Sequence, residues 1–577
     1  MNLLAPVAAR VAHLPLLVGT DVAPGDTIAV LEVMKMEQPI RARVAGRLSA
    51  ISVEVGQAVS AGDILATIIE GELSEREIEP VPENDLSALD EVVERHRLVG
   101  DQARPEAVGK RHSRGHRTAR ENVADLTYEF VEYGPLVIAA QRGRRDLDDL
   151  ITHTPADGLV GGIGRVETGA EGDDRVIVVS YDYTVLAGTQ GMQNHRKKDR
   201  LFSLASETGL PVVLFAEGGG GRPGDVDWPG ASILDVPAFR LFAEIPGPTI
   251  GINNGYCFAG NAALLGQCDV IVATPDSNVG MGGPAMIEGG GLGVFRPDEI
   301  GPSDVQASNG VIDVLVADDA EAVAVTRQLL GLLRDPTSSG ETPDQTSLRS
   351  AVPANRRELY DMRQVIEGLV DDDSFLELRR DFGRAAITGF GRVDGRPLGI
   401  IANDPSHLAG AIDHEAASTL AKHMLLCDRW DLPILSLCDT PGFMVGPDAE
   451  AEGLVRSAGQ LFRAAASVSV ATGTIVTRRG YGLGAQAMAS GGFHEPRFTV
   501  AWPNSEFGPM GLEGAVKLGF RKELEAIEDP DERLVELDRR VQEMAEIGRA
   551  LNVATHFEID DVIDPADSRR WVLTALF

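Results

Sequence analysis

Glu32-Val33-Met34-Lys35-Met36-Glu37 is the stretch from which the fold and role of this 577-residue chain are most readily inferred. One lysine stands between two methionines, and apolar and acidic residues flank the three. This composition is unusual for an ordinary hairpin tip. We therefore expect Lys35 to lie at a tight, exposed turn and to carry a group covalently. The alternative is an unmodified surface lysine in a small β-domain.

The residues around this turn repeat one another. Segment 18–29 recurs about 37 residues later as segment 55–66, so that Gly25-Asp26 matches Gly62-Asp63. Short alternating runs in both copies are typical of strands, and the glycines of turns. A repeat within so short a piece predicts two similar sheets that face each other.

With Met34, Lys35 and Met36 in these places, residues 1–72 resemble a biotinyl carrier domain, whose attachment motif is Met-Lys-Met. The resemblance implies a small all-β barrel-sandwich domain with biotin attached to Lys35 by a biotin protein ligase. Met34 and Met36 are then expected to contribute to the cofactor site. A lipoyl domain shares this architecture but usually lacks methionines on both sides.

Length and charge exclude several classes of protein. A chain of 577 residues is too long for one core, so about three domains are expected. The formal net charge of −34 argues against nucleic-acid binding, because no overall positive field gathers phosphates. No apolar run reaches the roughly 18 to 20 residues that span a bilayer, and no signal peptide is read. We expect a cytoplasmic protein without membrane or nucleic-acid partners.

The cysteines give no metal-ligand spacing. Cys257, Cys268, Cys427 and Cys438 lie far apart, and we expect them to behave as small buried hydrophobic residues. Neither a disulfide framework nor a metal site is predicted.

A linker follows the carrier pattern. Segment 71–84 is acidic, contains two prolines and has few large apolar groups, which is typical of a flexible connection. A linker of about 14 residues has a taut limit near 50 Å, so the carrier can swing within that limit. Segment 85–98 then shows an apolar helical face, and we assign 73–98 to linker and helix. The residues of that face are Leu86, Leu89, Val92 and Val93.

The rest of the chain repeats an α/β pattern. From about residue 158, apolar strands alternate with glycine turns and amphipathic helices. Four segments of the first half return in the same order at offsets of about 222 to 227: 162–166 as 389–393, 187–188 as 409–410, 210–211 as 432–433, and 255–256 as 480–481. This order predicts two copies of one α/β fold, at about 99–345 and 346–577.

Two glycine-rich turns are candidates for the chemistry. Segment 217–222 has four consecutive glycines after an apolar strand, and segment 478–485 offers a comparable turn in the second copy. Glycines allow a backbone to approach a ligand and to aim successive amides at one point. Such amides stabilise an oxyanion where a thioester carbonyl becomes an enolate. For the glycines alone, a merely tight turn is an equal alternative.

From about Gly109 onward these motifs together resemble the carboxyltransferase (beta) subunit of biotin-dependent acyl-CoA carboxylases. Further matching motifs are 115–121, 283–287, 402–405, 439–443, 501–503 and 510–511. The resemblance implies tandem crotonase-like domains, the first on the acyl-CoA side and the second on the biotin side. It also implies that the first half of one subunit faces the second half of another, commonly in a hexamer.

The resemblance assigns roles to backbone amides. It implies that the amides of Gly219 and Gly220 hold the thioester oxygen of acyl-CoA. The amides of Leu483 and Gly484, beside Gly482, then hold the ureido oxygen of biotin. Glycine and alanine are usual at 483 and 484, so we expect Leu483 to adopt a conformation that glycine finds easier.

Side chains suggest substrate contacts. Gln486 occupies a position that influences acyl-chain choice in the family, which leaves the substrate open. Arg196, Lys197 and Lys198 cluster at the start of a predicted helix and are candidates for the phosphates of coenzyme A, with a solvated helix face as an equal alternative. Segment 109–121, the most basic stretch, is interpreted as a solvated face, with a phosphate or subunit contact left open.

The expected function is transfer of a carboxyl group from carboxybiotin on Lys35 to the α-carbon of an acyl-CoA. No ATP-grasp-like nucleotide loop is found, so a separate ATP-dependent biotin carboxylase must load the biotin. Two alternatives stay open. One is a decarboxylase or transcarboxylase subunit acting on a malonyl-type CoA, and the other is a non-catalytic biotin-carrying scaffold.

Overall fold

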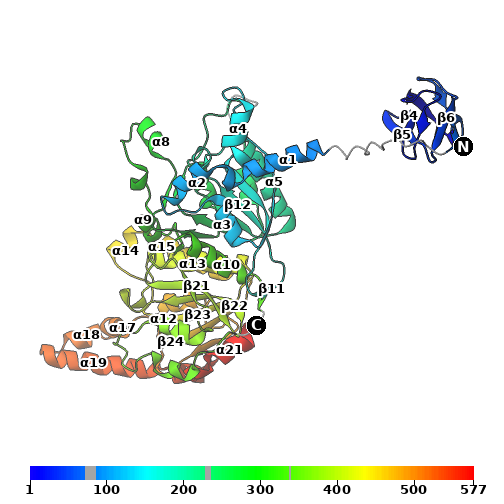
Figure 1. Cartoon of the computed structure of the whole chain (residues 1–577). Coiled ribbons are helices and arrows are strands. Elements are labelled where there is room, and N and C mark those ends of the chain that lie inside the picture. Colours follow the sequence, from blue (N-terminus) through cyan, green and yellow to red (C-terminus); the bar gives the residue numbers. More distant parts are fainter. Residues whose placement is uncertain (72–85, 228–234, 337–339) are drawn as a thin grey trace. The chain divides into compact units, whose positions relative to one another are not determined.

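A computed structural model describes residues 1–71, 86–227, 235–336 and 340–577 (Figure 1). The chain divides into two compact units, Met1–Asp90 and Glu91–Phe577. Apart from Gly71, the linker predicted at 71–84 lies outside the described residues.

Unit 1 consists of two four-stranded antiparallel sheets with the orders β1-β8-β6-β3 and β5-β4-β2-β7. Their strands are β1 Asn2–Leu4, β2 Ala9–His13, β3 Asp21–Val22, β4 Thr27–Val33, β5 Met36–Arg41, β6 Gly46–Ile51, β7 Ala58–Val59 and β8 Ile64–Glu70. Leu31, Leu48 and Leu65, all fully buried, form part of one core shared by both sheets. The predicted pair of sheets is confirmed.

The internal repeat of unit 1 is also visible in its turns. Gly25 and Gly62 have left-handed backbones, with φ of 103° and 91°. In each copy the aspartate after this glycine caps the turn: Asp26 accepts an amide hydrogen bond from Ala23 (2.9 Å), and Asp63 accepts one from Ser60 (2.7 Å). The sequence repeat therefore corresponds to a repeated strand–turn–strand unit.

Unit 2 contains two large mixed sheets (Figure 1). The first has the order β18-β16-β14-β13-β12-β10-β9, and the second β20-β21-β22-β23-β24-β25-β27, with β26 also paired to β24. The strands of the first are β9 Glu129–Glu132, β10 Leu159–Arg165, β12 Arg175–Tyr181, β13 Val212–Phe215, β14 Thr249–Asn253, β16 Val270–Ala273 and β18 Val314–Leu315. Those of the second are β20 Leu376–Leu378, β21 Ala386–Val393, β22 Arg396–Asn403, β23 Ile434–Thr440, β24 Thr472–Tyr481, β25 Thr499–Ala501, β26 Glu506–Gly508 and β27 Asp561–Val562. Two small sheets pair β11 Ala170–Glu171 with β19 Asp335–Pro336, and β15 Tyr256–Phe258 with β17 Asn278–Gly280.

The two large sheets share one topology. In each, two antiparallel pairings at one edge are followed by four parallel pairings. Strand β12 thus corresponds to β22, β13 to β23 and β14 to β24. This equivalence confirms the two copies of one α/β fold predicted from the repeat.

Helices cover the sheets and join the halves. Those of the first half are α1 Ser87–Val99, α2 Pro105–His112, α3 Ala119–Leu126, α4 Leu147–His153, α5 Met192–Thr208, α6 Ala238–Ala243, α7 Gly260–Leu265, α8 Pro284–Gly289, α9 Ser303–Ser308 and α10 Asp319–Gly331. Those of the second are α11 Leu348–Ala351, α12 Met362–Leu369, α13 His414–Arg429, α14 Pro447–Ala451, α15 Leu454–Ser467, α16 Gly482–Met488, α17 Leu512–Gly519, α18 Arg521–Glu525, α19 Pro530–Ile547, α20 Ala550–Thr555 and α21 Ser568–Ala575. Helices α10 and α13 lie between the two sheets, in one apolar core that draws residues from both halves (Figure 1).

Helix α1 confirms the helix predicted at 85–98, but its apolar face is not packed. Leu86, Leu89, Val92 and Val93 are each 46 to 59% exposed. Periodicity alone therefore identified the helix without indicating whether its apolar face is covered.

All four cysteines are buried and free of disulfides, as expected for small hydrophobic residues. None of the helices in the described part of the chain has the length and apolar character needed to cross a bilayer.

Candidate functional site

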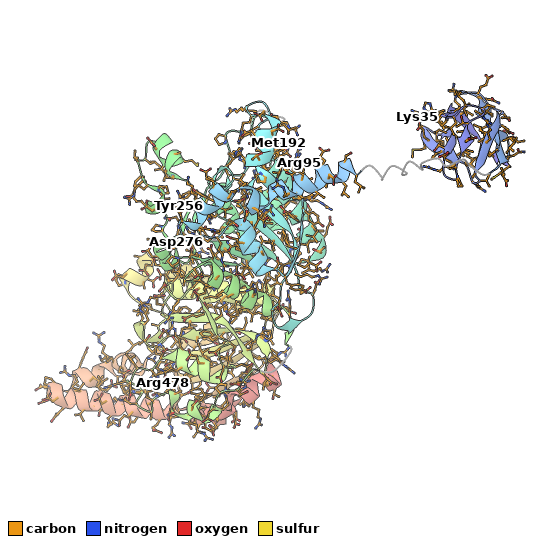
Figure 2. The ribbon with its side chains drawn as sticks, viewed as in Figure 1. Lys35, Arg95, Met192, Tyr256, Asp276 and Arg478 are labelled. Carbon is orange, nitrogen blue, oxygen red and sulfur yellow. The ribbon has the colours of Figure 1, made fainter. Side chains whose placement is uncertain are left out.

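Lys35 lies at the tip of the β4–β5 hairpin (Figure 2). Met34 and Lys35 form its two-residue turn, with φ of 50° and 67°. Positive φ at both central residues is the pattern of a type I′ turn, which Asn and Gly usually occupy. Met34 is 94% and Met36 73% exposed, and Lys35 is exposed between them. A lysine held in this sparsely populated conformation between two exposed apolar side chains fits a covalent attachment point.

In unit 2 the same three segments meet in each half, at the carboxyl ends of the central strands. We call Leu186–Gly188, the turn 218–222 and the start of α7 the first-half loops. The second-half loops are Leu408–Gly410, the turn 440–444 and the start of α16. Each of these two sets of loops contains residues with φ above 45°. Such residues reverse the direction of the chain within a short turn.

Equivalent hydrogen bonds hold both sets of loops. The Gln190 amide donates to the Gly220 carbonyl (2.7 Å), and the Arg222 amide donates to the Gln190 carbonyl (3.0 Å). In the second half, 222 positions later, the Ile412 amide donates to the Gly442 carbonyl (3.0 Å), and the Met444 amide donates to the Ile412 carbonyl (2.9 Å). The two sets of loops are therefore built alike.

Gly188 and Gly410 permit the close approach of these loops to the strand ends. Their φ values are 60° and 78°. A Cβ on Gly188 would lie 2.6 Å from the Glu217 carbonyl oxygen, and one on Gly410 would overlap the Asp439 carbonyl oxygen. Only glycine fits at either position without moving backbone.

The four-glycine turn differs from what its composition suggests. The Gly219 amide donates to the Ala187 carbonyl (3.0 Å), and the Gly220 amide donates to the Asn261 side-chain oxygen (3.1 Å). Both amides expected to face a thioester are thus engaged within the protein, because the turn packs against its neighbouring loop and α7. Binding of the thioester oxygen by these two amides stays a prediction, and both amides donate to protein oxygens here.

The Tyr481 turn also differs from expectation. Gly482 carries the left-handed φ of 58°, whereas Leu483 lies within α16 and is 61% exposed. The expectation that Leu483 needs a glycine-like conformation is therefore wrong. Leu483 and Gly484 occupy the first turn of α16, whose amides have no acceptor inside the helix.

The two turns compared in the sequence also occupy different places in the two copies. The turn 218–222 follows β13, and its structural counterpart after β23 is 440–444. The segment 478–485 corresponds instead to 255–260, which leads into α7. The sequence did not distinguish the turn after the central strand from the segment before the following helix, because both are rich in glycine.

The lysines predicted for phosphate binding lie inside the protein. Lys198 is fully buried, and its ammonium donates to the Tyr181 hydroxyl (2.8 Å). Lys197 is 7% exposed and donates to the carbonyls of Ala156 and Leu159. Burial lowers their pKa values to about 7 and about 8. This corrects the prediction for both lysines, since neither presents its charge to solvent.

Only Arg196 of that cluster is exposed. The predicted cluster is therefore split by the 3.6-residue period of α5, which turns Arg196 to the surface and the next two residues to the interior.

Two buried carboxylates, Glu217 and Asp439, stand in motifs noted in the sequence, but the sequence assigned their side chains no role. Each is at the end of the equivalent central strand, β13 or β23, and they are 5% and 0% exposed. Glu217 forms a bidentate pair with Arg111, a residue of the basic stretch that was interpreted as a solvated face. Burial, partly opposed by Arg111, raises the pKa of Glu217 to about 7. The shared offset of 222 residues is the signal that would have paired them.

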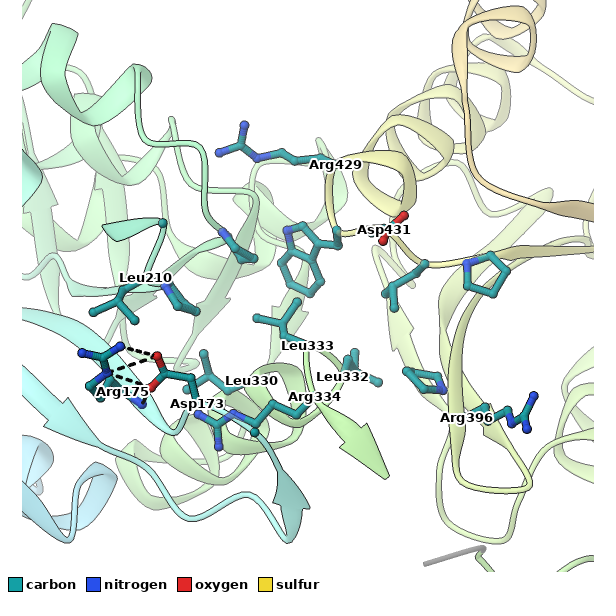
Figure 3. A pocket seen from close by; sticks show the side chains of 18 of the residues that line it. Asp173, Arg175, Leu210, Leu330, Leu332, Leu333, Arg334, Arg396, Arg429 and Asp431 are labelled. Atoms are coloured by element: carbon teal, nitrogen blue, oxygen red, sulfur yellow. Dashed lines mark hydrogen bonds and ion pairs between the residues drawn. The ribbon is translucent and has the colours of Figure 1, made fainter. Parts of the chain in front are cut away.

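Three cavities of unit 2 are relevant to binding. One of about 370 Å³ lies beside Gln486 and Gly482 and has mostly apolar walls. A second, of about 300 Å³, lies among the second-half loops and is lined by Ala409, Arg479 and Tyr481. A third, of about 980 Å³, lies between the halves at the amino ends of their strands, where Arg175 pairs with Asp173 (Figure 3).

The third cavity is remote from the second-half and first-half loops along the strands. Figure 2 labels Tyr256, the first residue of β15, and Arg478, near the carboxyl end of β24, which precede α7 and α16 in the chain.

Comparisons with known proteins divide the chain in the same way. Residues 110–576 match the family described as carboxyl transferase domain, and residues 6–68 match the family described as biotin-requiring enzyme. The methylmalonyl-CoA carboxyltransferase 12S subunit of Propionibacterium freudenreichii subsp. shermanii is 30% identical over 85% of this chain and 93% of its own length. The biotin-dependent long chain acyl-coenzyme A carboxylase beta4 subunit of Mycobacterium tuberculosis is 31% identical over 85% of this chain and 94% of its own.

Two solved structures are also similar. A single-chain, multi-domain long-chain acyl-CoA carboxylase has 50% identity and a TM-score of 0.82 over all of this chain, which spans 56% of that protein. The hexameric transcarboxylase 12S, with methylmalonyl-CoA bound, has 28% identity and a TM-score of 0.75 over 87% of this chain and 96% of its own.

Proposed function

The chain belongs to the carboxyl transferase domain family and carries a domain of the biotin-requiring family, and from this we propose that it moves a carboxyl group between biotin on Lys35 and the α-carbon of an acyl-CoA. The presentation of Lys35 at an exposed hairpin tip, in one chain with a repeated carboxyl transferase fold, carries this proposal. The relatives confirm the predicted family, the enzyme class and the dependence on biotin.

Unit 1 fits the cofactor. The exposed turn presents the Lys35 ammonium between Met34 and Met36, whose side chains offer an apolar surface to an attached group. When bound, biotin supplies a carrier for an activated carboxyl group. The protein's part is to present, bind and orient it.

We assign the two halves different tasks. The amides of Leu483 and Gly484, at the start of α16, are proposed to bind the ureido oxygen, with Gly482 providing the turn. The first-half loops are proposed to bind the acyl-CoA thioester, and the exposed Arg196 is proposed to contact the phosphates of coenzyme A. Because the amides of Gly219 and Gly220 are bonded within the protein, their use requires exchange of those bonds for the substrate oxygen.

The finer architecture is part of the same proposal. We propose tandem crotonase-like domains at 99–345 and 346–577, after a carrier at 1–72 and a connection at 73–98. The common strand order of the halves supports this division. The hexamer of transcarboxylase 12S supports a homo-oligomer here. A separate biotin carboxylase, a biotin protein ligase and a cytoplasmic location stay predictions.

A transfer assay with purified protein tests the function. We expect exchange of carboxyl between a malonyl-type CoA and free biotin without any partner. With ATP, bicarbonate and acyl-CoA, the protein alone should be inactive until a biotin carboxylase is added. Absence of exchange would favour the scaffold alternative, whose support is weakened by the regular conformation of Leu483. Carboxylation without a partner would refute the need for a carboxylase.

Substitution of Gly410 tests the second-half loops. The change Gly410→Ala places a methyl group against the Asp439 carbonyl oxygen at a left-handed φ of 78°. We expect kcat/KM for transfer to free biotin to fall by about 100-fold, because a shift of about 1 Å in a binding group has that effect. The matched control is Gly519→Ala, where no atom lies within 4 Å of the new methyl group. Equal activity of the two variants would contradict this placement.

The apolar cavity beside Gln486 supports a long acyl chain as substrate. Its walls include Phe493, Phe507 and Met544, and its volume of about 370 Å³ suits an alkyl chain. Both the single-chain carboxylase and the mycobacterial beta4 relative are described as acting on long chains. We therefore propose that Gln486 lies beside the distal part of a long acyl chain.

Filling this cavity tests the proposed chain length. Met544→Trp should lower kcat/KM for long-chain acyl-CoA at least tenfold more than for propionyl-CoA, since each excluded CH₂ loses about 0.8 kcal/mol of burial. The control is Val535→Trp, on the same helix α19 but 69% exposed and outside the cavity. A uniform effect on all chain lengths would exclude this cavity as the acyl site.

A further inference from the structure

Glu217 and Asp439 occupy the same place in the two copies of the fold. Glu217 lies two residues after the end of β13. Asp439, 222 positions later, is the penultimate residue of β23. Both carboxylates are buried, and both lie at the point where the loops of their half converge. Ionised groups in such positions are retained only with several compensating partners.

Asp439 has partners at both carboxylate oxygens. Oδ1 accepts hydrogen bonds from the Arg479 amide (3.2 Å) and Nε (2.6 Å). Oδ2 accepts from the Tyr360 hydroxyl (2.9 Å) and from Arg478 Nε (3.0 Å). The Arg478 guanidinium also lies 4.6 Å from the centre of the Tyr360 ring.

The two arginines extend this network to the loops. Arg479 Nη2 donates to the Ala409 carbonyl (2.9 Å), inside the left-handed loop Leu408–Gly410. Arg478 Nη1 donates to the Glu358 carbonyl (2.6 Å). One buried carboxylate thus ties the end of β24, which leads into α16, to two other walls of the second-half cavity.

Glu217 plays the corresponding part in the first half with a different partner. Its two oxygens accept from Nη1 (2.7 Å) and Nη2 of Arg111, a residue of α2. Arg111 Nε donates to the Arg117 carbonyl (2.9 Å). Gly255 lies so close that a Cβ there would overlap the Glu217 carboxylate. The pair therefore ties α2 to the end of β13, and Gly255 packs directly against the Glu217 carboxylate.

Stability is a weak explanation for these groups. Burying a charged pair costs desolvation that its attraction barely offsets, and apolar substitutes are often as stable. Bidentate and multiply bonded carboxylates do, however, impose direction on the segments that they join. The named partners of each carboxylate come only from its own half.

We propose that Glu217 and Asp439 are positioning residues with divided tasks, Glu217 orienting the first-half loops for acyl-CoA and Asp439 orienting the second-half loops for biotin. Neither touches the reacting atoms in this assignment. The inference rests on the proposed function. It adds that Glu217 affects the binding of acyl-CoA and Asp439 the binding of biotin, so that the two effects can be measured separately.

The test uses full-length, biotinylated protein and carboxyl transfer from a malonyl-type CoA to free biotin, with each substrate varied in turn. We expect Glu217→Gln to raise KM for the CoA substrate by about tenfold and KM for biotin less than about twofold, as for loss of a hydrogen bond to a charged group. Asp439→Asn should show the opposite pattern. Calorimetric titration with the CoA ester supplies a readout independent of turnover, in which only the Glu217 variant binds weakly.

Milder variants keep the test valid if the first two fail to fold. Tyr360→Phe removes one bond to Asp439 and should raise only the biotin KM, by about threefold. Arg111→Lys keeps the charge near Glu217 but loses the bidentate pair, and should raise only the KM for the CoA ester. An exposed control, Arg521→Ala, should change neither KM.

The possible outcomes are distinct. Equal rises in both KM values for every variant, or a pattern exchanged between the halves, would overturn the division of tasks. A wild-type protein that catalyses no transfer would refute the proposed function. An active wild-type protein whose variants change both KM values equally would refute only this inference.

Discussion

Replacing Lys35 by arginine is expected to remove biotin from the protein and to abolish carrier-dependent carboxyl transfer. The variant keeps a positive charge at the exposed turn but has no amine that can form the amide with biotin. Tethering raises the effective concentration of a bound group, so its loss should lower the rate by about 10² to 10⁴ at low free biotin. Intact mass should fall, beyond the change of side chain, by one biotinyl group.

The same variant should retain transfer to free biotin, because unit 2 contains all the loops assigned to the reaction. Lys522→Arg is the matched control, since Lys522 is an exposed lysine of α18. Persistence of the biotinyl mass in the Lys35 variant would show that another lysine carries the cofactor. Loss of transfer to free biotin as well would show that Lys35 has a role beyond attachment.

Replacing Arg379 by alanine is expected to produce the largest loss of stability in unit 2. Arg379 Nη1 donates to Asp313 Oδ1 (2.6 Å), and both side chains are only 1% exposed. Arg379 Nε also donates to Thr419 (2.7 Å), so the pair joins the edge of the first sheet to α13 of the second half. Removing Arg379 leaves the buried Asp313 carboxylate with Lys422, whose ammonium lies 3.6 Å from Oδ1, as its remaining cationic partner. Breaking a buried pair in this way is expected to cost about 3 kcal/mol. Urea unfolding of the full chain, followed by tryptophan fluorescence, measures the free energy of unfolding.

Two further variants identify the cause of that loss. Arg521→Ala breaks an exposed pair with Glu525, which should change the free energy of unfolding by less than about 1 kcal/mol. The double variant Asp313→Asn with Arg379→Met removes both charges and should recover part of the loss. A double variant less stable than Arg379→Ala would instead assign the effect to packing.

The features that the sequence predicts correctly are local or periodic. The turn at Lys35 follows from a few neighbouring residues, and the facing sheets follow from a repeat within 50 residues. The tandem fold follows from segments that recur at nearly constant offsets, which only equivalent strands and loops maintain. Helix α1 was predicted from its apolar period, but the exposure of Leu89 and Val92 depends on which surfaces surround the helix.

The features that the sequence leaves undecided depend on contacts between distant segments. A run of glycines does not show that Gly220 donates to Asn261, because that partner comes from α7, about 40 residues further along the chain and beyond β14 and β15. A cluster of cations does not show that Lys198 is buried against Tyr181 while Arg196 faces outward.

Sequence by itself determined that this chain combines a lysine-bearing β-domain with two copies of an α/β fold, because those patterns are written in neighbouring or repeated residues. Tertiary structure alone decided how the charged interior of each copy is arranged. Arg111 meets Glu217 across 106 residues, and Arg478 meets Asp439 across 39. Pairing over such distances is set by how the strands and loops pack, since only folding brings those groups within reach and removes water from around them.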